Sequence, residues 1–454
     1  MNGSVQCGLT ASFLSWATPT FNIQMRKFVI SCSVKMIFFK KNIRSSYVVM
    51  VAYLMALVLL VTTCEFSKEE NKLSGIVNAQ GEEFAGSDTC IKCHKAITDS
   101  HVSTPHFLTS QPGNFETVQG SFDSGKNVFT LNERLKVVME KSSAGLFQHA
   151  FVGGNEVDKK RIDITLGSGR QGQTYLFWEN NVLFQLPVSY HAPSNSWSNS
   201  PGYPTDQIIF NRSISARCLE CHSTFFKSGK PMDGNETFDK KHVMLGVDCE
   251  RCHGPAARHV TFHDKNPEEQ EAKYIVNPAT LTRKQKLDNC ALCHSGLRNN
   301  LMPAFSYSVG ENLDDFLFPT HAPDSSATME VHGNQFGLLS LSKCFSMSTM
   351  DCSSCHNVHV KETKKLEVFS ARCMNCHKEG SDNFCKQPAV KGLVLSKNCI
   401  DCHMPALPSR QVFLRSGNNK STPFFIRTHL VGNYKKQVAQ FLEKISERSS
   451  PQND

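Results

Sequence analysis

The sequence lacks a large excess of charge once its N-terminal segment is set aside. The formal net charge is +8, but six Lys and Arg residues precede Cys64 with no acidic residue among them, which leaves +2 (8 − 6) for the rest. No basic stripe that could follow a phosphate backbone survives in that remainder. We therefore exclude nucleic acid as a partner.

One uncharged apolar run, residues 47–63, follows three basic residues at 40–44, as in a secretory signal. We expect an exported, membrane-tethered protein on the periplasmic or outer-membrane side, and we favour a lipoprotein acylated at Cys64. An uncleaved anchor, for which 17 residues is near the lower limit, and a plain cleaved signal are the alternatives. Met36 would be a natural initiator, so we base no prediction of the fold on residues 1–35.

The sequence Cys-x-x-Cys-His occurs seven times. Two thiols three positions apart lie on one face of a helical turn. The pattern is the attachment signature of c-type haem, in which the thiols bond the haem vinyl groups and the His is the proximal iron ligand. The cysteines are Cys90, Cys93, Cys218, Cys221, Cys249, Cys252, Cys290, Cys293, Cys352, Cys355, Cys373, Cys376, Cys399 and Cys402. The histidines are His94, His222, His253, His294, His356, His377 and His403.

Chance does not explain seven copies. With 19 Cys and 18 His in 454 residues, roughly 0.03 copies are expected. Paired CxxC units also form four-thiolate zinc sites, but zinc has no need of a His after every second Cys. We predict seven covalently bound c-type haems, whose propionates and ferric irons bring the net charge to roughly −5. That balance favours other redox proteins as partners, including a quinol-linked donor.

The spacing of the motifs divides the chain. The first motif, at Cys90, lies 128 positions before the second, whereas the other six occupy the 186 residues 218–403. So dense a cluster leaves little polypeptide for an apolar core, and the porphyrin faces must pack between short helices and loops. Residues 120–205 are rich in β-branched and aromatic residues between turn signals, which indicates a small antiparallel β-element.

The C-terminal end has a clear helical pattern. Four apolar residues at helical spacing between Val438 and Ile445 predict a packing helix over 431–448. The other expected parts are a linker at 65–85, a multihaem domain at 86–430 and a disordered tail at 449–454.

Axial ligation decides whether each haem is a carrier or a catalyst. An iron with two His ligands mainly transfers electrons, whereas a five-coordinate iron can bind small molecules. Eleven histidines remain outside the motifs, enough for every iron. We rank His101, His149, His191 and His321 low as second ligands. The distal candidates are His106, His242, His259, His263, His332, His359 and His429.

Three segments carry a family resemblance: GVDCERCHGPAARH, STMDCSSCHNVH and NCIDCHMP. They resemble modules of the cytochrome c-552/c-554 family, within the hydroxylamine oxidoreductase and pentahaem nitrite reductase group, over about residues 86–430. The resemblance implies a helical, haem-packed fold with stacked haem pairs, mostly bis-His ligation and electron transfer in the cell envelope. We therefore expect a mainly α fold with little regular secondary structure and a small antiparallel β-rich insert.

The sequence also departs from that group. No motif ends in Lys, as the catalytic motif of the pentahaem nitrite reductases does. Hydroxylamine oxidoreductases carry eight haems, one cross-linked to a Tyr, and no Tyr here has a comparable context. Activity therefore does not transfer from any one member, and catalytic residues stay unassigned.

Two cysteines of the exported region, Cys344 and Cys385, lie outside the motifs. In an oxidising compartment an even pair favours a disulfide, so we predict a Cys344–Cys385 bridge. Two free thiols are the alternative.

Two functions fit the sequence. The favoured one is a heptahaem c-type cytochrome that transfers electrons in the bacterial cell envelope. The alternative is a multihaem oxidoreductase that reduces or oxidises a small nitrogen or sulfur oxyanion at one five-coordinate haem, with nearby side chains as proton donors.

Overall fold

A computed structural model divides the chain into two units, residues 1–70 and 71–454. The apolar run at 47–63, apart from Met55, and the lipoprotein candidate Cys64 lie outside the described residues. In the part of the chain that the structure describes, no helix is both long and apolar enough to cross a bilayer. Besides Met55, the structure describes residues 73–204, 206–319, 329–362, 366–388, 393–415 and 421–449.

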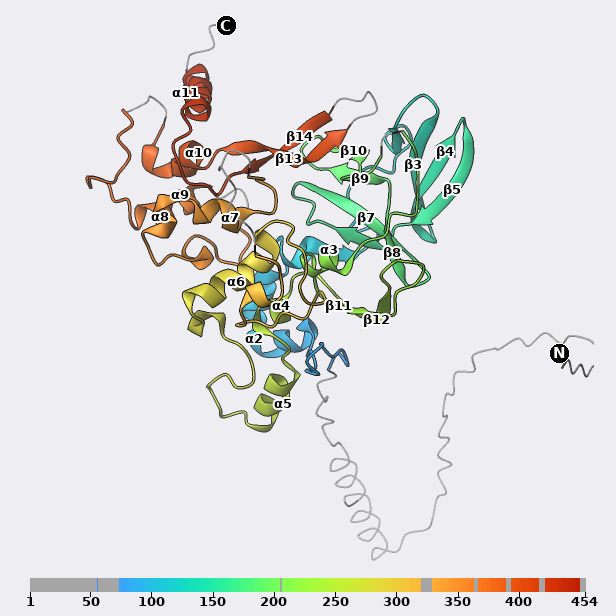
Figure 1. The fold of residues 1–454 in the computed structure, drawn as a ribbon, viewed down its shortest axis with the longest axis horizontal. Coiled ribbons are helices and arrows are strands. Elements are labelled where there is room, and N and C mark those ends of the chain that lie inside the picture. Colours follow the sequence, from blue (N-terminus) through green and yellow to red (C-terminus); the bar gives the residue numbers. More distant parts are fainter. Residues whose placement is uncertain are drawn as a thin grey trace, which may run out of the picture. The chain divides into compact units, whose positions relative to one another are not determined.

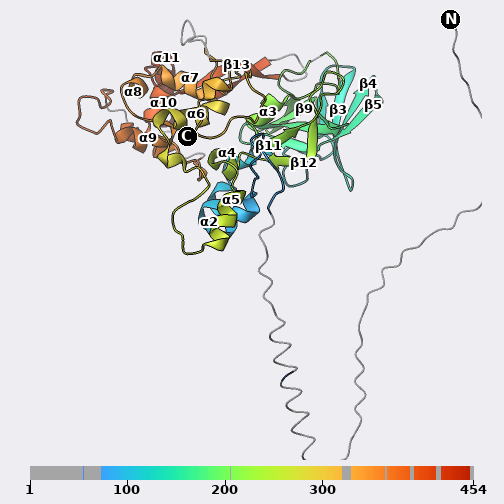
Figure 2. The same cartoon turned by 60° about the horizontal axis from the view of Figure 1, so that its bottom comes forward.

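Two antiparallel sheets occupy one side of the second unit, and most helices occupy the other (Figures 1 and 2). One sheet has the order β2-β3-β4-β5, and the other has the order β1-β6-β7-β9-β10 with β8 paired to β7. Their strands are β1 (Ser110–Pro112), β2 (Val128–Thr130), β3 (Leu135–Ser142), β4 (Gly145–Val152), β5 (Asn155–Arg161), β6 (Ile164–Leu166), β7 (Gly172–Glu179), β8 (Val182–Gln185), β9 (Val188–His191) and β10 (Ser196–Asn199).

One apolar cluster draws side chains from both sheets. Val137 and Met139 alternate along β3 toward the core, as the two-residue period of a strand requires. Leu146 of β4 and Tyr175 of β7 are also fully buried in this cluster, and Trp197 of β10 joins it. The sheets therefore form a sandwich with its own core.

Tight turns join neighbouring strands of the sandwich. Asn180 and Asn181, between β7 and β8, both have positive φ, 48° and 65°. Gly153 and Gly154, between β4 and β5, have φ of 59° and 90°. Two successive residues with positive φ form the type I′ turn, whose twist matches that of a hairpin, and Asn and Gly tolerate that conformation best.

A second apolar cluster joins the sandwich to the helical side. Leu219 and Phe225 pack with Phe226, Phe238 and Phe305, and all five are buried. The cluster also includes residues of β6 and β7. The sheets are thereby fixed to the segment that carries the second Cys-x-x-Cys-His motif.

The helices are short, and each motif lies on or beside one. Motif 1 is within α2, motif 3 forms α4, and motif 7 forms α10. The α-helices of the second unit are α2 (Ser87–His101), α3 (Ala216–Glu220), α4 (Cys249–His253), α5 (Ala257–Lys265), α6 (Arg283–His294), α7 (Gln335–Ser340), α8 (Lys343–Ser346), α9 (Leu366–Met374), α10 (Cys399–His403) and α11 (Lys435–Ser449), with a 3₁₀ turn η5 (Cys352–Ser354) at motif 5.

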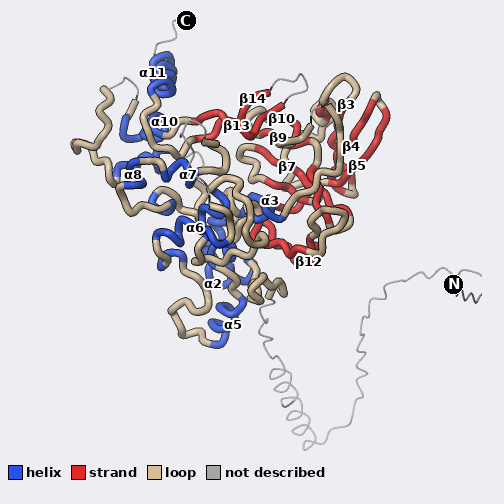
Figure 3. Tube along the Cα trace, in the orientation of Figure 1, coloured by secondary structure: helices blue, strands red, loops and turns tan. Residues whose placement is uncertain are grey.

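The expectation of a mainly α fold is wrong, because strands are nearly as abundant as helices (Figure 3): of the residues that the structure describes, 28% are helical and 25% lie in strands. The insert is a two-sheet sandwich, and two hairpins lie in the region where we expected only helices and loops. A haem motif needs only a single helical turn. The chain between motifs must pair its backbone N–H and C=O groups in another way, and in these two hairpins strand pairing does so. The hairpins are β11 (Ser223–Ser228) with β12 (Phe238–Leu245), and β13 (Ala406–Arg415) with β14 (Ser421–Arg427).

The C-terminal helix α11 lies where the apolar spacing predicted one. It contacts α10, the helix of the seventh motif. The helix against which α11 packs is therefore α10.

Candidate haem-binding site

All seven motifs converge on one cavity of about 2,290 Å³. At least one Cys and the His of every motif line it, although the motifs are spread from Cys90 to His403. A pocket for one small ligand typically measures about 300–1,000 Å³. The cavity therefore has room for several large groups side by side.

Local capping explains how the motifs turn. Asp248 precedes motif 3, and its side chain accepts a hydrogen bond of 2.7 Å from the amide of Cys249. Gly254 ends the same turn with φ of 76°, which suits glycine. At motif 5, Asp351 and Ser354 form a capping box. These caps hold the thiols and the His of a motif in one compact turn.

Five of the seven motif histidines have a hydrogen-bond partner at Nδ1. Such a contact fixes the ring and leaves Nε2 for a metal, the usual arrangement of a ligating His. The Nδ1 contacts are His222 to Thr109 Oγ1 (3.0 Å), His253 to Val276 O (2.9 Å), His294 to Gln335 Oε1 (3.0 Å), His377 to Asn383 O (2.7 Å) and His403 to Gly432 O (2.9 Å).

Three motif histidines face a second His ring at a consistent distance. The ring centroids are 6.1 Å apart for His294 and His106, 6.2 Å for His253 and His359, and 6.2 Å for His356 and His429. Two imidazoles that bind one metal from opposite sides, each at about 2.0–2.1 Å, have centroids roughly 6.3 Å apart. Three distal candidates, His106, His359 and His429, are thereby placed opposite a motif His.

Burial keeps several of these rings neutral. Desolvation lowers the pKa of His106 and of His429 to about 4. Desolvation also lowers the pKa of His294 and of His356. A ligating imidazole must be deprotonated at the metal-binding nitrogen, so the site favours the ligating form.

Two further motifs have distal candidates nearby. His332 lines the cavity and acts electrostatically on His222 of motif 2. His94 of motif 1 acts likewise on His259, whose Nδ1 lies 2.8 Å from the carbonyl of Lys273. His263 lies 4.6 Å from the ring of His259 and also lines the cavity.

The structure places His242 away from the cavity, contrary to our ranking. This His lies on β12 and pairs with Asp239 at 2.6 Å, because the hairpin directs it to the surface carboxylate. His149 and His191, which we ranked low, lie on β4 and β9 of the sandwich. His321 lies outside the described residues.

His101, which we ranked low as a second ligand, lies at the cavity. This His is buried, lines the cavity, and neither ring nitrogen has a hydrogen-bond partner. Its ring lies 6.2 Å from that of His359, and its Nε2 lies 3.7 Å from Asp248. The available signal was its position seven residues after His94, although α2 is kinked at His94 and the two residues do not lie on one regular helix.

The anchoring thiols of different motifs touch one another. These contacts make motif 1 a neighbour of motif 3, motif 2 and motif 5 neighbours of motif 4, and motif 6 a neighbour of motif 7. The thiol pairs that lie close enough to shift each other's pKa are Cys90 with Cys249, Cys221 with Cys293, Cys290 with Cys352, and Cys373 with Cys399.

Cys344 and Cys385 are free thiols in the structure and do not form the predicted disulfide. Cys344 acts on the pKa of Cys355 and of Cys373, whereas Cys385 acts on that of Cys402. Each therefore lies among the haem-anchoring thiols of different motifs rather than against the other.

The residues lining the cavity fit covalent haem. Nδ1 and Nε2 of His101, Nε2 of His263 and Nδ1 of His429 are buried polar atoms without a partner there. Within the described ranges, no group of three or more His, Cys, Asp or Glu is arranged to hold a metal ion directly. Each Cys pair would hold a haem through thioether bonds, and the adjacent His would ligate its iron.

Motifs, cavity and facing histidines define a multihaem c-type cytochrome. The family model for "Cytochrome c554 and c-prime" matches residues 196–254, which confirms the family resemblance inferred from the motifs. The chain is also similar, at 27% identity over 195 residues, to the "Multiheme cytochrome MtrA" of Shewanella baltica (strain OS185).

That alignment covers 41% of this chain and 45% of the relative, so the chain spans less than half of the relative's length. Among solved structures, the outer cell wall cytochrome OcwA is similar with a TM-score of 0.48 and 15% identity. The superposition covers 77% of this chain and 79% of that one.

Proposed function

We propose that the chain carries seven c-type haems and passes electrons along them in the cell envelope. The observation that carries this proposal is the convergence of all seven motifs on one continuous cavity. Separate haem pockets would isolate the redox centres, whereas haems held by these motifs in a shared cavity would be close enough to exchange electrons.

The thiol contacts support a definite order of neighbours. Motif 1 touches motif 3, and motif 4 touches motifs 2 and 5. Cys252 of motif 3 acts electrostatically on Cys290 of motif 4, and Cys376 of motif 6 acts on Cys355 of motif 5. Motif 6 touches motif 7. The proposed electron route is therefore 1-3-4-5-6-7, with motif 2 as a branch at motif 4.

The proposed setting is the outer side of a membrane, with a lipid or helix anchor at the N-terminal segment. The basic and apolar run that ends at Cys64 supports export. Partners would be other redox proteins, including a quinol-linked donor. Mass spectrometry of the N-terminal peptide purified from membranes tests the anchor, because acylation at Cys64 adds lipid mass and removes the preceding residues.

Intact-mass spectrometry of the purified protein tests the haem count. A mass seven haems above that of the processed chain is expected, together with low-spin ferric signals in electron paramagnetic resonance (EPR). A smaller haem complement in a fully processed, folded protein would refute the proposal.

One observation favours the second candidate, an oxidoreductase. In the part of the chain that the structure describes, no second His ring lies against His377 or His403, whereas three other motif histidines have one. An iron at motif 6 or 7 with an open position would bind a small nitrogen or sulfur oxyanion. High-spin EPR signals that change on adding nitrite or hydroxylamine would support this function, and uniformly low-spin signals would exclude it.

A further inference from the structure

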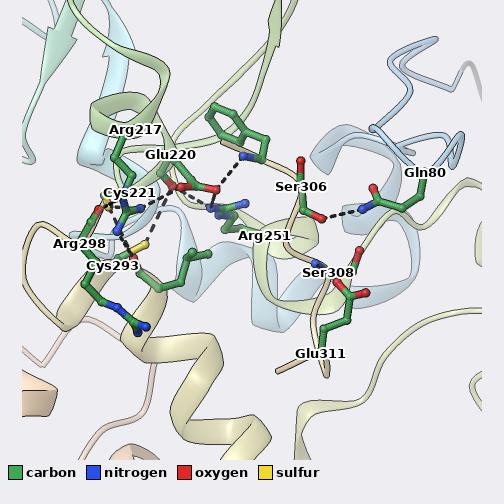
Figure 4. A network of polar contacts seen from close by, with 12 residues as sticks. Gln80, Arg217, Glu220, Cys221, Arg251, Cys293, Arg298, Ser306, Ser308 and Glu311 are labelled. Carbon is green, nitrogen blue, oxygen red and sulfur yellow. Dashed lines mark hydrogen bonds and ion pairs between the residues drawn. The ribbon is translucent and has the colours of Figure 1, made fainter. Parts of the chain in front are cut away.

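A buried charge cluster joins three of the motifs (Figure 4). It consists of Arg217, Glu220 and Arg251, and each of these side chains is at most 10% exposed. Arg217 directly precedes motif 2, Glu220 lies inside motif 2, and Arg251 lies inside motif 3. We call these three residues the Arg–Glu–Arg cluster.

The contacts of the cluster converge on the residue before the second Cys of each motif. Arg217 Nη1 donates to Glu220 Oε2 at 2.8 Å, and its Nη2 donates to the carbonyl of Leu292 at 2.9 Å. Arg251 Nη2 donates to the carbonyl of Glu220 at 2.9 Å. Glu220, Arg251 and Leu292 occupy this same position in motifs 2, 3 and 4. The cluster thus ties three haem-anchoring turns together.

The anchoring sulfurs lie directly beside these charges. Arg217 Nη1 is 3.4 Å from Cys221 Sγ, and Cys221 is in contact with Cys293 of motif 4. The carbonyl of Glu220 lies 4.0 Å from Cys293 Sγ. A charge at this position would act on haems held by motifs 2 and 4 at close range and through little solvent.

Stability alone does not account for such a cluster. Burying charges costs several kcal/mol per ion, and apolar residues of similar volume often serve a core equally well or better. Glu220 is nevertheless fully paired, because Oε1 accepts the amide of Phe305 at 2.7 Å and lies 3.9 Å from Arg251. The two guanidinium groups and one carboxylate give the cluster itself one net positive charge, beside Asp248 and Glu250, the buried carboxylates at motif 3.

We propose that the Arg–Glu–Arg cluster sets the reduction potentials of the haems at motifs 2 and 4 and holds motifs 2, 3 and 4 in register. Positive charge stabilises the reduced haem, which carries one electron more, and negative charge opposes it. Glu220 and Arg251 are positioning residues at the branch of the electron route. This inference rests on the proposed function.

Opposite substitutions in the full-length holoprotein test the cluster. Glu220→Gln keeps the size and one acceptor but removes the negative charge, so one or two haem transitions should move to higher potential in a spectroelectrochemical titration. Arg251→Gln removes a positive charge and should move them to lower potential. Arg251→Lys keeps the charge and should restore potentials close to those of the wild type.

The matched control is Asp314→Asn. Asp314 pairs with Arg298 at 2.7 Å nearby, but its side chain is 48% exposed, so solvent screens its charge and the titration should not change.

Haem content, measured by intact mass, distinguishes failure of the proposed function from failure of the cluster's role. Fewer than seven haems in the wild type would refute the proposed function, whereas unchanged potentials in both Gln variants with full haem content would refute only the cluster's role. If Glu220→Gln fails to assemble, comparison of Arg251→Gln with Arg251→Lys still tests whether the cluster's charge sets the reduction potentials.

Discussion

Single histidines decide what each haem of this cytochrome can do. His429 faces His356 at a ring separation of 6.2 Å, and both lie at the shared cavity. Replacing His429 with Ala should leave the haem of motif 5 five-coordinate, because no protein nitrogen then occupies its second side. We expect a high-spin EPR signal from about one haem per protein, where the wild type has a low-spin one.

The control for this variant is His242→Ala. His242 pairs with Asp239 on β12 and does not line the cavity, so its loss should leave every haem signal unchanged. A low-spin spectrum for the His429 variant, identical to that of the wild type, would contradict the assigned pair.

The motif residues and most candidates for their partners could be predicted, but the pairing of each partner with its motif could not, for one physical reason. The thiols and proximal His of a motif are fixed by one helical turn, so five residues of sequence suffice. The facing pairs join residues far apart in the chain, such as His106 with His294 and His253 with His359. Only the fold brings these together, so local context showed neither that His242 lies away from the cavity nor that His101 lines it.

The sequence predicted individual helices and strands better than it predicted the fold class. The enrichment in β-branched and aromatic residues around β3 and the helical spacing in α11 were both visible in the sequence. The two-sheet architecture was not, because strand order depends on pairing between distant segments. The hairpin of β11 and β12 was not predicted for the same reason, because its register is set by pairing between the two strands.

We expect the free energy of unfolding of the sandwich to be independent of haem binding in the cavity. Met139 of β3 is fully buried in the sandwich core and does not line the cavity. Met139→Ala should therefore lower the free energy of unfolding of the sandwich by about 2–5 kcal/mol, through lost burial and a new cavity. Calorimetry should detect the loss, while haem content and visible spectrum stay unchanged.

Val157→Ala on β5 is the matched control, because Val157 is 56% exposed and should change stability by no more than about 0.5 kcal/mol. Loss of haem from the Met139 variant at a temperature where the sandwich is folded would contradict this separation.

The whole molecule has an uneven distribution of charge along the proposed route. Residues 366–449, which include motifs 6 and 7, contain 13 Lys and Arg against 6 Asp and Glu, a formal excess of +7. Residues 73–365 contain 28 against 31, a formal charge of −3. His377 and His403 are exposed in the basic segment, as are Lys435 and Lys436 of α11. An anionic partner is therefore favoured at the end of the route formed by motifs 6 and 7.

This asymmetry predicts how the reduced protein reacts with small oxidants. Oxidation by ferricyanide, an anion, should slow several-fold as salt rises from 10 to 500 mM, because salt screens the attraction. Oxidation by the cation tris(phenanthroline)cobalt(III) should not slow in the same way. Replacing Lys435 and Lys436 with Glu should reduce the low-salt ferricyanide rate in stopped-flow measurements by roughly 2–10-fold. The same exchange at Lys240 and Lys241, exposed on β12, should leave that rate unchanged, and an equal effect of both double variants would show that electrons leave elsewhere.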